Sequence, residues 1–186
     1  VGVLHYQPPE LQTVKTFRGV QRSPNFDYFG MSVQIFQLLF LARHPFAGRF
    51  SGQGDMPIER AILENRFAYG ASSRQAGMTP PPGALTLQFM PPAVAQLFER
   101  AFSPASRNGG RPTPAEWVQA LSAFEQNTVA CRVNGNHLYF SSLPSCPICA
   151  IERGTILFLP PISRIGPAFG STFNLAAVWA AIERVQ

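Results

Sequence analysis

Three cysteines and one histidine within nineteen positions constrain the fold of this chain more than any other feature. They are Cys131, His137, Cys146 and Cys149. Two thiolates separated by two residues can hold one Zn²⁺ from a single turn. A second Cys and a His from the preceding loop complete a tetrahedral set of ligands. The Asn134-Gly135-Asn136 segment gives the loop between this Cys and the His a sharp reversal. The spacing therefore predicts a closed, structural zinc site.

Other interpretations of this cluster are a disulfide with a spare thiol, or three inert buried cysteines. An odd number of cysteines disfavours a disulfide framework, and the chain has no feature typical of a secreted protein. A catalytic zinc ion needs an open coordination position and a nearby general base, but four protein ligands close the shell. The remaining histidines, His5 and His44, also lie far away in the sequence.

The composition predicts a packed globular protein with many turns. The chain has 186 residues, 46% of them hydrophobic, with sixteen Phe, eighteen Pro and fifteen Gly. That length suggests one domain with a small appendage. The net charge of +5 comes from scattered arginines, which do not alternate with aromatic residues, so we do not expect nucleic-acid binding.

The sequence predicts a cytoplasmic protein that does not enter a membrane. No signal peptide is visible, and unpaired cysteines suit a reducing compartment. The longest apolar stretch, residues 29–42, is too short for a confident membrane span and contains Gln34 and Gln37. We interpret it as part of a buried helix.

Hydrophobic spacing predicts several helices. The first covers residues 26–41, is apolar nearly all round and should form the centre of the domain. Pro57 begins a second helix that should run to Phe67, and Pro91-Pro92 begins a third. The polar, proline-rich connection that includes residues 80–83 should lie on the surface.

A capping box predicts where the next helix begins. Thr113 is the N-cap, Pro114 takes the first helical position and Glu116 the third. That helix should bury Trp117, Val118, Leu121 and Phe124. After the cysteine cluster, residues 155–159 could form a short strand. Asn174 caps a last helix, one face of which carries Leu175, Val178, Trp179, Ile182 and Val185.

Four segments, in order, resemble the C-terminal lobe of a eukaryotic-like protein kinase. Residues 6–10 (Tyr-Gln-Pro-Pro-Glu) resemble the Ala-Pro-Glu that closes the activation segment. Residues 27–33 (Asp-Tyr-Phe-Gly-Met-Ser-Val) resemble the Asp-x-Trp-Ser-x-Gly-Val at the start of the central helix. Residues 43–46 match Arg-x-Pro-Phe, and residues 111–116 match Arg-Pro-Thr-x-x-Glu.

The resemblance covers about residues 4–126, with Pro8, Phe29 and Ser32 departing from the usual Ala, Trp and Gly. The chain is similar to bacterial Ser/Thr kinases of the tellurite-resistance or stress-associated type, which carry a Cys/His zinc module after the kinase domain. The resemblance implies a mainly α fold, with a kinase C-lobe over residues 1–128, a zinc module over 129–152 and a C-terminal extension with a helix over 153–186.

The resemblance also implies roles for individual residues. Glu10 would pair with Arg111, and Asp27 would accept hydrogen bonds from the backbone of the catalytic loop. Tyr6, Gln7 and Pro8 would border the pocket for the residue after the phosphoacceptor. From the residues alone, Asp27 is an ordinary carboxylate in the first turn of a helix, and residues 6–8 are plain loop.

Phosphoryl transfer by a kinase needs parts that this sequence does not contain. They are a glycine-rich loop, a strand lysine, a catalytic Asp with its Asn, and the Asp of Asp-Phe-Gly. The only lysine, Lys15, follows the Pro-Pro-Glu segment and cannot serve as the strand lysine. We expect the chain to be part of a longer kinase that supplies the ATP and Mg²⁺ sites.

Two functional interpretations follow from the sequence. In the first, the chain is the substrate-side lobe of a Ser/Thr kinase, and its partners are a protein substrate and the missing N-terminal lobe. In the second, it is a non-catalytic, pseudokinase-like scaffold whose zinc module and last helix bind a protein or nucleic acid. The last helix could contact a signalling partner or simply pack on the domain.

Overall fold

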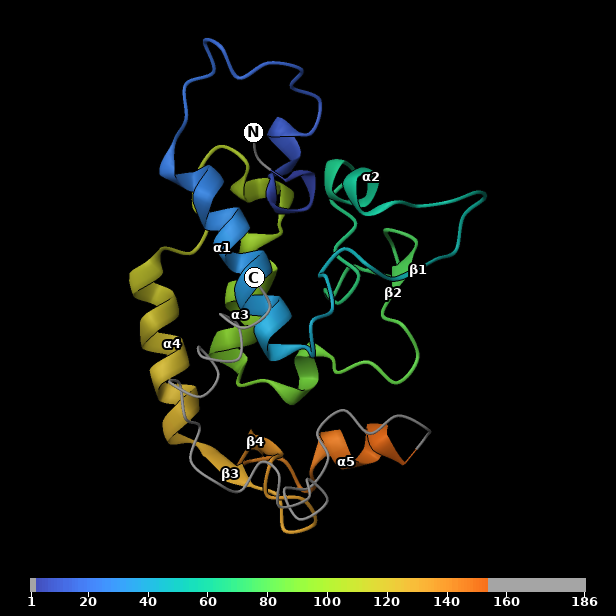
Figure 1. Cartoon of the computed structure of the whole chain (residues 1–186), viewed down its shortest axis with the longest axis vertical. Coiled ribbons are helices and arrows are strands. Elements are labelled where there is room, and N and C mark those ends of the chain that lie inside the picture. Colours follow the sequence, from blue (N-terminus) through green and yellow to red (C-terminus); the bar gives the residue numbers. More distant parts are fainter. Residues whose placement is uncertain (1–2, 154–186) are drawn as a thin grey trace, which may run out of the picture.

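The computed structural model describes residues 3–153 (Figure 1). It is mainly helical, as the sequence predicts. The described elements are four 3₁₀ turns, five α-helices and two small two-stranded sheets: η1 (Leu4–Tyr6), η2 (Pro9–Leu11), α1 (Pro24–Leu39), β1 (Arg49–Phe50), α2 (Ile58–Leu63), β2 (Met78–Thr79), η3 (Leu87–Phe89), α3 (Pro92–Ala101), η4 (Pro104–Ser106), α4 (Pro114–Gln126), β3 (Thr128–Ala130), β4 (Leu138–Phe140) and α5 (Pro147–Glu152).

Helix α1 lies at the centre of the main core, where aromatic rings dominate. It packs on α3, and α3 packs on α4 (Figure 1). Phe36 stacks on Phe40 with ring centroids 3.9 Å apart and meets Phe98 of α3 edge to face at 5.1 Å. Trp117 of α4 contacts Phe98 from the other side at 4.8 Å. The many phenylalanines of the sequence thus join three helices into one core.

The central helix spans residues 24–39 rather than the predicted 26–41, and it is not buried all round. Leu38 is 83% exposed, whereas Phe29, Val33 and Phe36 are fully buried. Ser32 is buried too. Its hydroxyl donates a hydrogen bond of 2.7 Å to the Tyr28 carbonyl, which satisfies the polar group inside the core.

Helix α2 is shorter than predicted, because it ends at Leu63 rather than near Phe67. Asn65 has a φ of 53°, in the left-handed region that ends many helices. The Arg66 amide then donates to the Ala61 carbonyl at 2.8 Å, a closing pattern typical of a helix C-terminus. Phe67 instead begins a buried segment that joins the main core.

The capping box of α4 is confirmed. The Thr113 hydroxyl accepts from the Glu116 amide, and a Glu116 carboxylate oxygen accepts from the Thr113 amide at 2.9 Å. The predicted buried face is only partly correct. Trp117 is buried and Leu121 is half-buried, but Val118 is 65% exposed, because no described element covers that side of the helix.

Two small antiparallel sheets were not predicted from the sequence, because their strands have only two or three residues. In the first, Arg49 of β1 pairs with Thr79 of β2, and Phe50 pairs with Met78, across the segment that contains α2. Met78 is 1% exposed, so the connection after α2 enters the core and is not wholly a surface loop. The second sheet is the β3–β4 hairpin, which carries part of the cysteine cluster.

Within the described part of the chain, no helix is long and apolar enough to cross a membrane. The strand predicted over residues 155–159 and the helix predicted after Asn174 lie outside the described residues.

Candidate metal centre and the Glu10–Arg111 anchor

The β3–β4 hairpin brings Cys131 and His137 together. The Cys131 amide donates to the His137 carbonyl at 2.8 Å, which closes the loop between the strands. Inside the loop, the His137 amide donates to the Asn134 carbonyl at 2.9 Å, and the Asn134 side chain accepts from the Asn136 amide at 3.2 Å. The turn predicted from Asn134-Gly135-Asn136 is therefore present, and it aims both side chains to one side.

The first turn of α5 supplies the other two candidate ligands. Cys146 is the N-cap, Pro147 takes the first helical position and Cys149 lies one turn further on. This arrangement is the reason that a Cys-x-x-Cys pair presents two sulfurs in the same direction. Cys131, Cys146 and His137 are buried, and Cys149 is half-buried.

The ligand atoms of Cys131, His137, Cys146 and Cys149 lie within 4.8 Å of one another. The Sγ atoms of Cys131 and Cys149 are 3.5 Å apart, and His137 Nδ1 lies 3.7 Å from Cys146 Sγ and 3.4 Å from Cys149 Sγ. The edges of a tetrahedron around Zn²⁺ measure about 3.6–3.8 Å for such ligands. A disulfide needs sulfurs about 2.05 Å apart, and all three cysteines are free.

The surroundings of Cys131 and Cys149 shift the pKa values of their thiols in opposite directions. Backbone amides of Asn134 and Val133 lower the pKa of Cys131, and the Val133 nitrogen lies 3.4 Å from its Sγ. Burial and the neighbouring thiols raise the pKa of Cys149 to about 12. Several thiolates at this spacing repel one another, so a bound cation is what would keep them all deprotonated.

Residues outside the predicted set hold His137 in place. Its Nε2 lies 3.3 Å from a carboxylate oxygen of Glu152. A histidine that binds a metal through Nδ1 usually donates its other N–H to a carboxylate or a backbone carbonyl oxygen, and Glu152 can accept it here. The Nδ2 atom of Asn134 lies 2.9 Å from the same ring nitrogen. Glu152 lies three residues after Cys149 on α5, a helical spacing that the sequence could have revealed.

The donor set fits a metal ion with a closed, four-ligand shell. Three sulfurs and one imidazole nitrogen favour Zn²⁺ or another thiophilic ion over Ca²⁺ or Mg²⁺, which prefer oxygen. The four side chains take all four tetrahedral positions, so the arrangement suits holding the hairpin against α5 rather than activating water.

A second constellation joins the start of the chain to α4. Arg111 is 1% exposed in its side chain, and its two terminal nitrogens donate to the Glu10 carboxylate at 2.6 and 3.0 Å. Its Nη1 also donates to the Asn25 carbonyl at 3.0 Å, and its guanidinium lies 5.3 Å from the centre of the Phe29 ring. This two-pronged contact is the pair that the kinase resemblance implies.

Asn25, which the sequence analysis did not single out, organises this anchor. Its side chain donates to the carbonyls of Ser106 and Arg107 and accepts from the Arg111 amide at 3.2 Å. The first turn of α1 is thereby tied to the loop before α4. Nothing in the sequence marks such a role, because its partners are backbone groups more than 80 residues away.

The predicted substrate-side residues also meet in space. Tyr6, Gln7 and Pro8 line a cavity of about 170 Å³, and Asp27 of α1 lies on the same cavity. Gly30 makes this possible, because a Cβ at that position would lie only 3.0 Å from the Tyr6 carbonyl oxygen. The Asp27 side chain is exposed, and among the described residues no hydrogen bond to it is present.

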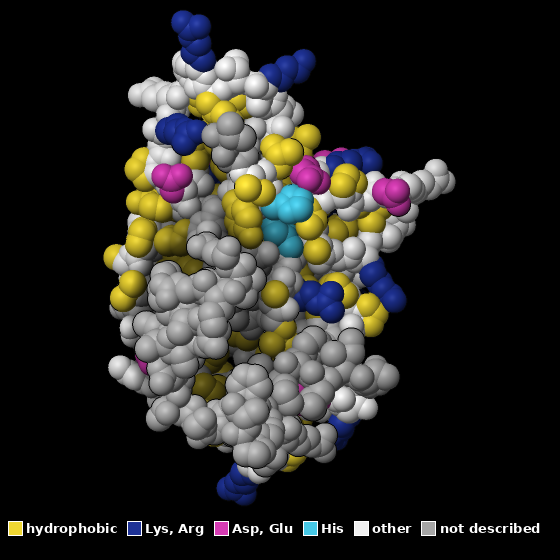
Figure 2. All heavy atoms as spheres, viewed as in Figure 1, with side chains coloured by type: hydrophobic (Ala, Val, Ile, Leu, Met, Phe, Trp, Pro, Cys, Tyr) yellow, Lys and Arg dark blue, Asp and Glu magenta, His cyan; other side chains and the backbone are white. Residues whose placement is uncertain are grey.

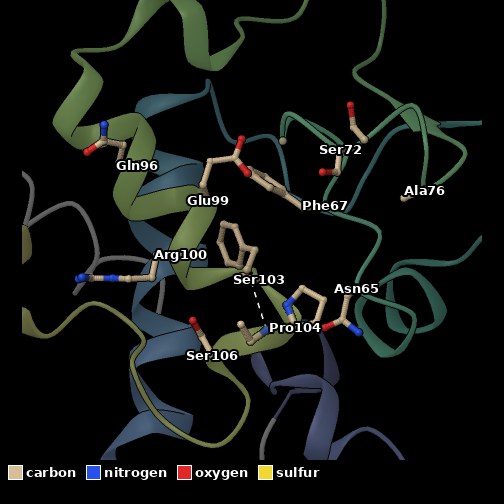
Figure 3. Close-up of a pocket in the computed structure, with 14 residues that line it drawn as sticks. Asn65, Phe67, Ser72, Ala76, Gln96, Glu99, Arg100, Ser103, Pro104 and Ser106 are labelled. Atoms are coloured by element: carbon tan, nitrogen blue, oxygen red, sulfur yellow. Dashed lines mark hydrogen bonds between the residues drawn. The ribbon is translucent and has the colours of Figure 1, made fainter.

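A larger cavity, of about 480 Å³ and lined by both polar and apolar side chains, lies between α3 and the segment after α2 (Figure 3). Its carboxylate, Glu99, already accepts a hydrogen bond of 2.6 Å from the Ala71 amide, and Ser103 caps η4 through the Ala105 amide. None of the predicted site residues lines it. On the face shown in Figure 2, basic side chains lie apart from one another.

The chain is similar to bacterial proteins named protein kinase YegI. It is 36% identical over 184 residues to that of Escherichia coli strain K12, and 35% identical over 184 residues to that of Escherichia coli O157:H7. Each match covers 98% of this chain, which spans only 28% of the length of these curated relatives. No family model matches the chain, and no solved structure matches it. The chain is therefore related to one part of a bacterial protein kinase.

Proposed function

We propose that this chain is the substrate-side lobe of a bacterial Ser/Thr protein kinase. The observation that carries the proposal is the Glu10–Arg111 pair, which joins two segments 101 residues apart. Each partner lies in a segment that resembles a kinase motif. Arg111 is buried, and a buried guanidinium needs a carboxylate partner to offset the cost of its desolvation. The identity to protein kinase YegI over nearly the whole chain supports the same proposal.

In this function the cavity beside Tyr6, Gln7 and Pro8 receives part of a peptide substrate. The exposed Asp27 carboxylate lies on that cavity, where it can hold the backbone of a catalytic loop supplied from outside residues 3–153. ATP and Mg²⁺ would bind to segments of the longer protein, and this lobe would position the acceptor hydroxyl.

The metal centre has a structural role in this proposal, with Zn²⁺ held by Cys131, His137, Cys146 and Cys149. The apolar core of its module is very small, because the buried hydrophobic cluster there consists of Cys131, Cys146 and Ile148. A bound ion supplies the folding free energy that such a core lacks. The spacing of the donor atoms supports tetrahedral coordination.

The kinase proposal is tested with the full-length gene product from which this sequence comes. We expect an Asp-Phe-Gly about twenty to thirty residues before the Pro-Pro-Glu segment, and transfer of phosphate from ATP to Ser or Thr of a peptide library. Arg111→Ala should lower kcat/KM for the peptide, and Arg100→Ala, at an exposed ion pair, should not. A full-length protein that does not bind ATP would overturn the proposal and favour the scaffold interpretation.

A further inference from the structure

A large apolar cavity lies between the helical core and the metal module. It measures about 640 Å³, and its walls come from the end of α1, from η3, from α4, from β4 and from the start of α5. None of the candidate metal ligands and none of the residues assigned to the substrate side lines it. We call it the apolar groove.

Exposed side chains on the walls show that the apolar groove is an unfilled surface. Leu38 is 83% exposed, Val118 is 65% exposed and Leu138 is 61% exposed, and each belongs to a different element. Scattered single apolar residues on a surface are common. A continuous patch built by three elements is instead typical of a site that another segment covers.

The sequence that follows α5 has the composition of such a covering segment. Residues 154–186 contain only three charged side chains, Arg164, Glu183 and Arg184. The pattern after Asn174 puts Leu175, Val178, Trp179, Ile182 and Val185 on one face of the predicted helix. Leaving an apolar helix face of this size in water costs free energy, and so does leaving the apolar groove exposed.

The connection and the length also fit this occupant. Segment 154–186 begins one residue after α5, and Pro147 and Ile148 of α5 line the apolar groove. A helix over residues 175–185 is about 16 Å long, enough to follow α4 from Val118 to Glu125 and reach β4. A tether of about twenty residues keeps the stripe near the groove at an effective concentration on the order of millimolar.

We propose that the amphipathic stretch at residues 175–185 docks in the apolar groove of its own chain. There it lies between α4 of the helical core and the β4–α5 part of the metal module. It thus adds apolar contacts between the core and the metal module, whose own cluster of buried residues is small. The proposal does not depend on kinase activity.

Trp179 gives a direct test, because the only other tryptophan, Trp117, is buried in the main core. The fluorescence of Trp179 is obtained by subtracting the emission of the Trp179→Phe variant from that of the intact chain. We expect blue-shifted emission, protection from acrylamide, and no dependence of either on protein concentration. Val118→Arg, at an exposed position in the groove, should shift the emission to the red and raise quenching.

The matched control is Val129→Arg, at an exposed valine of β3 that does not line the groove. It should leave the Trp179 signal unchanged. A second pair changes only the tail. Val178→Asp should expose Trp179, and Ala177→Asp, on the opposite face of the predicted helix, should not. These two substitutions leave the described fold untouched, so they test docking even if Val118→Arg does not fold.

Three results would each overturn the proposal. In the first, Trp179 of the intact chain is quenched as readily as free indole. In the second, the groove variants and their controls behave alike, which would mean that no specific site is involved. In the third, protection disappears on dilution, which would place the occupant in a second copy of the chain.

Discussion

Arg111 contributes to stability through several contacts at once. It pairs with Glu10 through two nitrogens, donates to the Asn25 carbonyl and lies over the Phe29 ring. Its side chain is almost completely buried, so each polar contact replaces water that the guanidinium has lost. Removing the side chain therefore leaves Glu10 without its partner.

We expect Arg111→Ala to lower the free energy of unfolding by about 3 kcal/mol, the lower end of the range for a broken buried pair, because Glu10 is 20% exposed. Urea denaturation followed by tryptophan fluorescence measures the change. Arg100→Ala is the control, because Arg100 and Glu116 are both more than 40% exposed, so solvent screens their pair and its loss should change stability much less. Equal losses in the two variants would contradict this account.

His44 should make stability depend on pH. Burial lowers the pKa of His44 from 6.5 to about 4, and its ring donates to the His5 carbonyl through Nε2 and accepts from the Phe46 amide through Nδ1. Between pH 6.5 and 4 the unfolded state binds the proton and the folded state does not. The contribution of His44 is therefore fully present above pH 6.5 and decreases as the pH falls to 4, by about 3 kcal/mol in total.

Comparison of the chain with His44→Asn, over pH 4 to 8 in urea titrations, measures this effect. Asparagine can still accept from the Phe46 amide, but it does not titrate, so the difference between the two curves isolates His44 from metal release at low pH. We expect the two curves to converge as the pH falls. Parallel curves would show that His44 is not the titrating group.

At the scale of single elements, α1 and α4 begin with similar sequences but different caps. Thr113 caps α4 through its hydroxyl, and the Glu116 carboxylate accepts a hydrogen bond from the Thr113 amide in return. The Ser23 side chain makes no capping hydrogen bond at α1. Both helices have a proline in the first position. Both N-cap residues carry a hydroxyl, but only that of Thr113 makes a capping hydrogen bond. Comparison of the two positions therefore measures the effect of the hydrogen bond itself.

Thr113→Ala should lower the free energy of unfolding by about 1 kcal/mol, because it leaves the backbone N–H of Glu116 without its acceptor. Ser23→Ala should change it by much less, since no bond is lost. Thermal unfolding monitored by circular dichroism compares the two variants. A larger loss for Ser23→Ala would contradict the assignment of the caps.

Local chemistry explains which elements were predictable. The capping box located the first residue of α4, and the Asn134-Gly135-Asn136 turn was correctly placed in the cluster loop. The end of α2 was missed because Asn65 adopts the left-handed conformation, which hydrophobic spacing does not report. The two small sheets were missed because their strands are too short to show alternation.

At the scale of the whole molecule, two separate sets of buried residues predict two levels of stability. The main core spans α1, α3 and α4, whereas the metal module has its own small cluster. We expect about one equivalent of zinc per chain, and chelation should unfold residues 128–152 and leave the helical core folded. Amide hydrogen exchange, read by mass spectrometry, resolves the two regions.

Cys146→Ser should reduce the zinc content and produce the same local loss of protection. Ser145→Ala, at an exposed neighbour, should keep the metal. Unchanged zinc in Cys146→Ser would remove this residue from the ligand set. Simultaneous unfolding of α1 and the module on chelation would show that they form one cooperative unit.

The sequence by itself determined the helical class, the capping box and the candidate metal ligands, because each depends on residues close together in the chain. Only the tertiary structure decided that Asn25 supports Arg111, that Glu152 holds His137 and that Leu38 and Val118 lie on one groove. These contacts join helices, loops and strands that the chain brings together only on folding. Spacing in the sequence reports the face of one helix, but not what lies opposite that face.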